Sequence, residues 1–197
     1  LPAIRRLVHE GWSPAAAAAA VSSGEAPSTA SPTRPVGSGS TALAGPEAES
    51  LTQDFLDAAS MVDVTRVEAV LDQAFALGPF EAVADAWLMP ALCALGEAWA
   101  EGRVDVAGEH AASYAVMRRL SAAFAAASSV SHGPRVVVGL PGGSHHELGA
   151  LAFATAARRR GLAVVYVGAD LPVDSWQRAV RAFPTRVAVL AVPTLDD

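Results

Sequence analysis

The sequence has little cysteine, few basic residues and no long uninterrupted apolar run. Cys93 is the only cysteine among 197 residues, which excludes a disulfide framework and a metal site built from several thiolates. Because its neighbours are alanines and leucines, we expect Cys93 to be a small buried side chain. No stretch of about 18 apolar residues is free of charge, so the sequence predicts no membrane-spanning helix.

The balance of charge is acidic, with 14 basic and 20 acidic residues and a formal net charge of −6. This balance argues against nucleic-acid binding by the chain as a whole, although a short basic element at one end is compatible with it. The apolar residues Ala15–Val21 follow an acidic turn that contains Trp12, which is unlike a secretory signal. Together with the scarcity of cysteine, this pattern favours a cytoplasmic protein. We recognise no nucleophile–base arrangement and no catalytic pair of carboxylates.

Segments of different composition follow one another along the chain. Residues 1–22 have the apolar spacing and the cap residues of two short helices. Residues 23–50 are rich in Ser, Gly, Pro, Ala and Thr, and they predict a flexible linker because they lack the large apolar side chains that offset the entropy of ordering. Residues 51–131 predict four helices, and their short connections favour an antiparallel four-helix bundle.

Cap residues and breakers set the expected limits of the bundle helices. Asp63 is the expected N-cap of the second helix. The third helix is expected over Phe80–Ala100, with Pro90 as the candidate position of a kink. Asp105 is the expected N-cap of a long fourth helix.

The last segment, residues 132–197, alternates strands with helices. Strands are expected over 135–140, 162–167 and 186–192. This alternation predicts a parallel, doubly wound sheet of Rossmann type, so the predicted fold class is α + α/β. Such sheets bind ligands at the carboxyl ends of their strands, and the first strand leads directly to His145 and His146.

The loop from Ser144 to Gly149 carries the first candidate site. Taken alone, it fits a polar loop that caps a helix, and it lacks the G-x-G-x-x-G spacing of a dinucleotide loop. It resembles the D/E-x-H-x-x-G signature of cobalamin-binding Rossmann domains. The resemblance implies that His146 is the lower axial ligand to cobalt and that Gly149 permits close approach of the corrin. His145 is either a second candidate ligand at the cofactor or a surface residue. Ser144 stands where the family has an acid that orients the imidazole, which implies a differently poised axial bond.

The second candidate site lies where the third and fourth helices meet. Taken alone, Trp99 fits the bundle core, and Glu109 with His110 fits an exposed helix start. Their spacing resembles the motif of the CarH/LitR photoreceptors of the MerR family, which bind adenosylcobalamin in a helix bundle. The resemblance implies that Trp99 covers the upper corrin face, with Val106, Glu109 and His110 around the adenosyl group. Light sensors of this family have a histidine directly after the tryptophan, and this chain has Ala100 there.

The resemblance extends to the amino-terminal residues. Residues 1–22 resemble the end of a MerR winged-helix DNA-binding domain, and we expect the chain to be a piece of a longer protein. The resemblance implies a transcriptional repressor, not an enzyme, that senses light through photolysis of the cobalt–carbon bond of adenosylcobalamin. It further implies a homo-oligomer, a tetramer in the dark, bound to operator DNA. The chain stops before the later strands that cradle the nucleotide tail in the family, and Ala191 stands near the position where the family often has a serine that contacts the tail.

Two other interpretations of the same residues stay open. A corrinoid methyl carrier or methyltransferase component shares the helical cap, the Rossmann domain and the histidine loop, and it uses methylcobalamin. A module that has lost its cofactor is favoured by Ser144, by Ala100 and by the short sheet.

Overall fold

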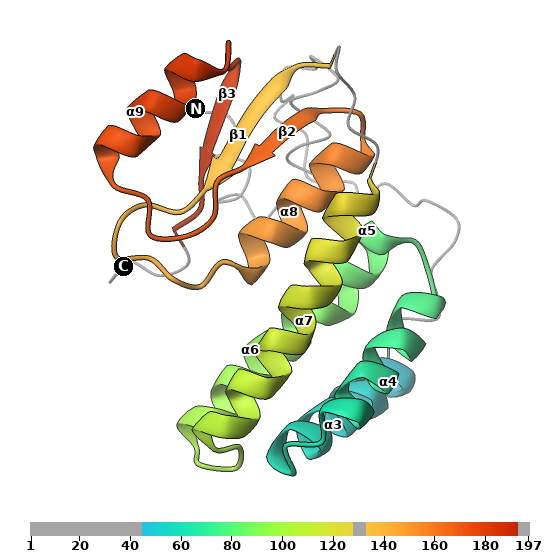
Figure 1. The fold of residues 1–197 in the computed structure, drawn as a ribbon. Helices are drawn as coiled ribbons and strands as arrows, with labels where there is room; N and C mark the ends of the chain where they lie inside the picture. Colours follow the sequence, from blue (N-terminus) through green and yellow to red (C-terminus); the bar gives the residue numbers. More distant parts are fainter. Residues whose placement is uncertain (1–44, 128–132, 193–197) are drawn as a thin grey trace, which may run out of the picture. The chain divides into compact units, whose positions relative to one another are not determined.

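The computed structural model describes residues 45–127 and 133–192 (Figure 1). The described residues divide into two compact units, one up to Arg119 and one from Leu120 onward, which we call the helical unit and the α/β unit. The expected winged-helix remnant, residues 1–22, and most of the expected linker lie outside the described residues. Within the described ranges, every helix is too short or too polar to cross a bilayer.

The helical unit contains the helices predicted for the bundle. Its elements are α3 (Pro46–Ser60), α4 (Val64–Ala76), α5 (Phe80–Val83), η1 (Ala84–Leu88), α6 (Met89–Ala100) and α7 (Val106–Ala126), whose last turns belong to the α/β unit. Asp63 caps α4 as expected, since its Oδ1 accepts a hydrogen bond from the Arg66 N–H at 3.0 Å. Asp105 caps α7 by accepting from the Gly108 N–H at 2.7 Å. Helix α3 begins at Pro46, inside the range that the sequence assigns to the linker.

The third predicted helix changes its winding just before Pro90. The chain passes from α5 through the π-helical turn η1 into α6, and the Met89 N–H bonds to the Ala84 carbonyl five residues earlier. Proline has no N–H to donate, so a regular α-helix would leave a carbonyl unpaired one turn before it. The π-turn is a common local adjustment to such a mismatch. The expected irregularity is therefore present, as a wide turn that precedes the proline.

Cys93 is exposed, so the prediction that it is buried is wrong. The buried residues of α6 are Ala91, Leu95 and Ala98, which recur at helical spacing and define its inner face. Cys93 lies on the other side of the helix. The apolar character of its neighbours in sequence concealed this because alanine and leucine occur on both faces of α6.

The core of the helical unit is built around aromatic and aliphatic side chains. Trp87 is almost fully buried and meets Phe55 edge to face, with ring centroids 6.1 Å apart. Its Nε1 is buried without a hydrogen-bond partner in the described part of the chain. Helix α7 starts in close contact with the end of α3, since a Cβ added at Gly108 would overlap the Ala59 carbonyl oxygen. Gly108 is thus the residue that lets these two helices touch.

The α/β unit confirms the predicted parallel sheet. Its elements are β1 (Arg135–Gly139), α8 (Leu148–Arg159), β2 (Ala163–Tyr166), α9 (Val173–Ala182) and β3 (Val187–Leu190). The described strands form one sheet of order β2-β1-β3, and β1 pairs in parallel with both neighbours. In register, Val137 lies between Val165 and Ala188.

The two helices of this unit cover opposite faces of the sheet (Figure 1). Val136 and Val138 form a cluster with Ala150 and Ala154 of α8. Side chains alternate between faces along a strand, so Gly139 belongs to the other face, where the Trp176 ring of α9 lies against it. The sheet is therefore doubly wound, as the alternation of elements predicts.

Candidate functional site

The loop between β1 and α8 lies at the switch point of the sheet. The chain leaves β1 toward β2 on one side and later reaches β3 on the other, so the connections diverge at the carboxyl end of β1. Open α/β sheets bind ligands in the crevice at such a point. The loop carries Ser144, His145 and His146 before α8 begins at Leu148. The structure thus places the predicted loop where the topology favours a ligand.

The neighbouring loop between β2 and α9 holds the start of the histidine loop through the backbone. The Leu140 N–H donates to the Gly168 carbonyl at 2.9 Å, and the Leu171 N–H donates to the Leu140 carbonyl at 3.2 Å. Trp176 adds a side-chain bond, since its Nε1 donates to the Leu140 carbonyl at 3.3 Å. The two loops therefore form one connected layer at the carboxyl edge of the sheet.

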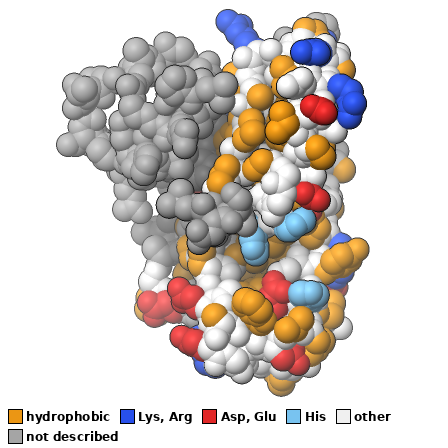
Figure 2. Space-filling view, turned by 90° about the vertical axis from the view of Figure 1, so that its left-hand side faces the viewer, with side chains coloured by type: hydrophobic (Ala, Val, Ile, Leu, Met, Phe, Trp, Pro, Cys, Tyr) orange, Lys and Arg blue, Asp and Glu red, His pale blue; other side chains and the backbone are white. Residues whose placement is uncertain are grey.

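Ser144 is fully buried, whereas both histidines after it are exposed. Figure 2 shows histidine side chains, in pale blue, at the surface of the face that it presents. The Ser144 carbonyl accepts from the Asp170 N–H at 3.0 Å. The described residues give neither His145 nor His146 a hydrogen-bond partner for its ring. The loop therefore presents two imidazoles outward from a fixed base. Gly149 follows in the first turn of α8 and is exposed as well.

Glu147 is held by a residue that the sequence did not single out. The Tyr166 hydroxyl donates to Glu147 Oε2 at 2.7 Å. Burial raises the pKa of Tyr166 well above its ordinary value, and the hydrogen bond to Glu147 and its negative charge raise that pKa further. Tyr166 therefore stays a neutral donor to this carboxylate. Its ring packs 6.2 Å from the Phe124 ring.

The predicted residues of the helical unit lie on either side of the turn between α6 and α7. Trp99, the penultimate residue of α6, is 50% exposed, and Val106 at the start of α7 is 55% exposed. The interpretation of Trp99 as bundle core is therefore wrong. Large apolar side chains that are exposed at the same turn are candidates for contact with a ligand.

Glu109 organises the polar side of the same turn. Its Oε1 accepts from the Ser113 hydroxyl at 2.6 Å, and its Oε2 lies 2.6 Å from His110 Nδ1. A carboxylate only accepts hydrogen bonds, so this contact places a proton on Nδ1 of His110. The other ring nitrogen, Nε2, then points away from Glu109. The His110 side chain is 75% exposed. Glu109 and His110 thus form a fixed pair, beyond the merely exposed helix start that the residues alone allow.

The donor set fits a corrin better than a metal held by side chains alone. The described residues contain no group of three or more His, Cys, Asp or Glu side chains that could hold a metal ion. A corrin supplies the equatorial ligands of cobalt itself, so one accessible imidazole on a rigid loop is the donor that it requires. The structure leaves both His145 and His146 accessible for such a role. Trp99 and His146 belong to different units, and their meeting across one cofactor stays a prediction.

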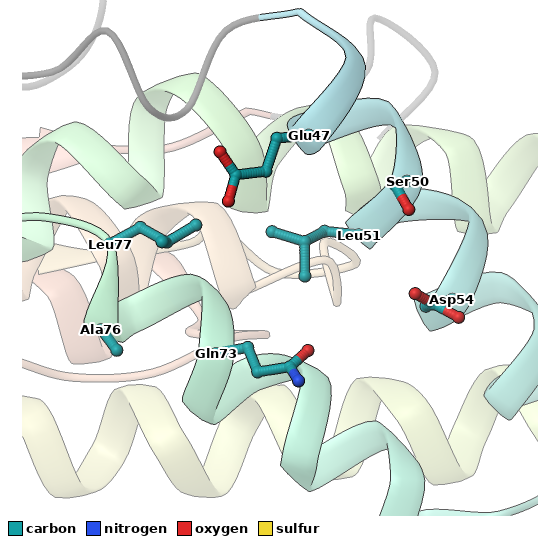
Figure 3. A pocket seen from close by; sticks show the side chains of 7 residues that line it. All are labelled: Glu47, Ser50, Leu51, Asp54, Gln73, Ala76 and Leu77. Atoms are coloured by element: carbon teal, nitrogen blue, oxygen red, sulfur yellow. The ribbon is translucent and has the colours of Figure 1, made fainter.

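Two hollows in the described part of the helical unit are lined by other residues. One of about 470 Å³ opens between α3 and α4, where Leu51 faces Leu77 and the acidic Glu47 and Asp54 border it (Figure 3). A second of about 370 Å³ is bordered by Thr52, Pro90 and other residues of α3, η1 and α6. Neither hollow is lined by a predicted site residue, so both are surface grooves between helices.

Residues 51–123 match a family model described as a B12 binding domain. In sequence the chain is 37% identical over 145 residues to the HTH-type transcriptional repressor CarA of Myxococcus xanthus. The aligned residues cover 73% of this chain and 49% of CarA. It is 36% identical over 146 residues to the HTH-type transcriptional repressor CarH of the same organism, which covers 74% of this chain and 48% of CarH. Over these residues the chain is similar in sequence to two transcriptional repressors.

The likeness to CarA and CarH has a defined extent. The chain spans about half the length of these curated relatives. The match to the B12 binding domain begins at the predicted start of the bundle, residue 51, and ends within α7. It therefore includes Trp99, Val106, Glu109 and His110, whereas the histidine loop lies beyond it.

Proposed function

We propose that this chain is the cobalamin-binding part of a light-responsive transcriptional repressor. The observation that carries the proposal is a pair of exposed, preorganised clusters. His146 projects from an anchored loop at the switch point of the sheet, and Trp99 with Val106 projects from a domain that matches the B12 binding family. The names of the relatives support a repressor, and the same names disfavour a methyl carrier.

In this proposal each residue has one task toward adenosylcobalamin. His146 would hold the cobalt through its imidazole, and Gly149 would leave room for the corrin beside α8. Trp99 and Val106 would cover the adenosyl group and exclude water from it. Glu109, already oriented by Ser113, holds His110 so that both can bond to the polar atoms of the adenosyl group. When bound, this cofactor supplies a cobalt–carbon bond that visible light breaks.

Trp99 and Val106 would make different contacts with and without a bound adenosyl group. Their apolar surfaces would be covered in the dark state and exposed to water after illumination, so the two states would differ in free energy. A difference of this kind shifts a two-state equilibrium in assembly. We propose that the dark state is a homo-oligomer, a tetramer, which binds operator DNA through a domain that precedes the bundle. A flexible linker would let several such domains reach the operator at once and raise their effective concentration.

Ala100 bears on the fate of the cobalt after illumination. The side chain of Ala100 is a methyl group, which cannot coordinate cobalt. Position 100 therefore offers no second imidazole directly after Trp99. We propose that release of the adenosyl group, without capture by a residue at position 100, is the signal. The alternative hypothesis, that the protein senses only the supply of cobalamin, predicts that light has no effect on its size.

The decisive experiment combines spectroscopy with measurement of size. The intact protein is mixed with adenosylcobalamin in the dark, its visible spectrum is recorded, and its size is followed on a column before and after illumination. Binding in the dark followed by a light-dependent change in size is the expected result. Methyl transfer from bound methylcobalamin to a thiol or a folate would instead identify a carrier. Absence of any spectral change on mixing would identify a module without cofactor.

A further inference from the structure

The exposed pair His145-His146 lies between two anchors that come from the neighbouring strand and loop. On the amino side, Asp170 Oδ1 accepts from the Gly143 N–H at 2.8 Å, and the Asp170 N–H donates to the Ser144 carbonyl at 3.0 Å. On the carboxyl side, the Tyr166 hydroxyl donates to Glu147 Oε2 at 2.7 Å. Both anchors lie about 20 or more residues from the loop in sequence, so local chain geometry does not create them.

The backbone of Asp170 is itself unusual. Its φ angle is +54°, a left-handed conformation that costs free energy for any residue with a side chain and is tolerated best by Asp and Asn. In this conformation the N–H and the carboxylate of one residue bond to consecutive residues of the histidine loop. A strained residue held in place by two such bonds is typical of functional sites.

The anchors matter because Ser144 stands where the D/E-x-H-x-x-G signature has an acidic residue. A carboxylate at that position would orient the axial imidazole directly, and the buried Ser144 offers only a hydroxyl. The carboxylates near the loop are instead Asp170, which bonds to its backbone, and Glu147, which Tyr166 fixes. Among the described contacts, these acids bond to the loop backbone and to Tyr166, and neither bonds to the His146 ring.

We infer that Asp170 and Tyr166 are positioning residues for His146, and that they set the strength of its bond to cobalt. They act through the loop, Asp170 through Gly143 and Ser144, and Tyr166 through Glu147. This inference rests on the proposed function, since it assigns the orientation of the axial ligand. It concerns residues outside the signature that the sequence shares with cobalamin-binding Rossmann domains.

The main test replaces Asp170 in two ways. Asp170→Gly removes the side chain and relieves the backbone strain, whereas Asp170→Asn keeps an oxygen that can accept from Gly143 and tolerates the same φ angle. With hydroxocobalamin as the probe, Asp170→Gly is expected to lower affinity by about tenfold or more, the usual effect of losing an outer partner of a metal ligand. Asp170→Asn is expected to retain most of the affinity. Asp174→Asn, at an exposed acid on α9, is the matched control for charge.

A spectroscopic readout separates positioning from general damage. Electron paramagnetic resonance of the reduced, cobalt(II) form detects a coordinated imidazole by its nitrogen coupling. We expect this coupling to weaken or disappear in Asp170→Gly and to return in Asp170→Asn, while thermal melting shows both variants folded. Tyr166→Phe removes the second anchor without any demand on the backbone, and we expect it to lower affinity in the same direction. Tyr166→Phe also keeps the inference testable if Asp170→Gly does not fold.

A measurement without cofactor distinguishes failure of the two anchors from failure of the proposed function. Amide exchange at Gly143 is expected to accelerate about tenfold in Asp170→Gly, because the N–H loses its acceptor. If the native protein binds hydroxocobalamin through an imidazole, but Asp170→Gly and Tyr166→Phe match it in affinity and nitrogen coupling, the anchors do not position His146. If the native protein does not bind hydroxocobalamin while exchange responds as expected, the anchors exist but the proposed function fails, and the inference fails with it.

Discussion

Glu109 Oε2 lies 2.6 Å from Nδ1 of His110, so the acid fixes both the orientation and the tautomer of the imidazole beside it. Glu109→Ala removes this restraint and the bond from Ser113. We expect the variant to bind adenosylcobalamin about tenfold more weakly in the dark, by analogy with outer partners of ligating histidines. Hydroxocobalamin, which lacks the adenosyl group, should bind nearly as before. Absorbance titrations with both cobalamins measure the difference.

A matched control for Glu109 is the exposed acid Glu101, whose partner is Arg103 at 2.7 Å. Glu101→Ala should change neither titration. An equal loss of affinity for the two cobalamins in Glu109→Ala would contradict a role at the adenosyl group.

Trp99→Ala should reduce selectivity for the adenosyl group and leave the fold almost intact. The indole is half exposed, so its loss removes little buried surface from the unliganded protein. We expect adenosylcobalamin affinity to fall about tenfold while hydroxocobalamin affinity changes little, since a tryptophan anchor is typically worth more than about 1 kcal/mol to a ligand. Met61→Ala, at another exposed apolar side chain, is the control. Unchanged selectivity in Trp99→Ala would remove this residue from the site.

His146→Ala should abolish the spectroscopic signature of imidazole ligation. His145→Ala, at the adjacent exposed histidine, should leave that signature in place. Visible spectra and nitrogen coupling with hydroxocobalamin distinguish the two variants. If only His145→Ala lost the signature, the axial ligand would be His145. If both variants kept the signature, the ligating imidazole would not come from this loop.

Tyr166 predicts a specific dependence of stability on pH. Its pKa in the folded protein is raised, so the folded state keeps the hydroxyl proton after the unfolded state begins to lose it near pH 10. The contribution is complete below about pH 10 and declines as pH rises above that value. Denaturant unfolding at several alkaline pH values should therefore show a steeper loss of stability in the native protein than in Tyr166→Phe. Tyr114→Phe, at the exposed tyrosine, should keep the steep profile.

Two glycines within helices should respond oppositely to the same substitution. A Cβ at Gly108 would overlap the Ala59 carbonyl oxygen, so Gly108→Ala is expected to destabilise the fold by about 1–3 kcal/mol. A Cβ at Gly96 meets nothing within 4 Å, so Gly96→Ala should stabilise the fold by about 0.5–1 kcal/mol through helix propensity. Thermal and urea unfolding measure both changes. Equal effects at the two positions would show that α3 and α7 do not touch at Gly108.

The elements of the fold were predictable because their signals are local. The spacing of apolar residues and the caps Asp63 and Asp105 located the helices, and the change of period at residue 135 located the sheet. The irregularity near Pro90 was also signalled, although its form as a π-turn depends on the packing of the whole segment. The face on which Cys93 lies was not predictable from its neighbours, since alanine suits an inner and an outer face equally.

The candidate site was predictable only in part. The motif residues were found because each lies in a short stretch of characteristic spacing. Tyr166 and Asp170 were missed, because their partners Glu147 and Gly143 are distant in sequence and become neighbours only through parallel strand pairing. The position of Asp170, after the end of a strand adjacent to β1, was the available signal.

The contact at Gly108 has a mechanical consequence for signalling. Gly108 stands between Val106 and Glu109, and its backbone rests on Ala59 near the end of α3 without space for even a methyl group. The first turn of α7 therefore cannot shift toward α3 on its own, and a push in that direction must carry α3 with it. Since α3 also packs against α4 and α6, a shift at Val106 or Glu109 toward α3 would reach the other helices of this unit.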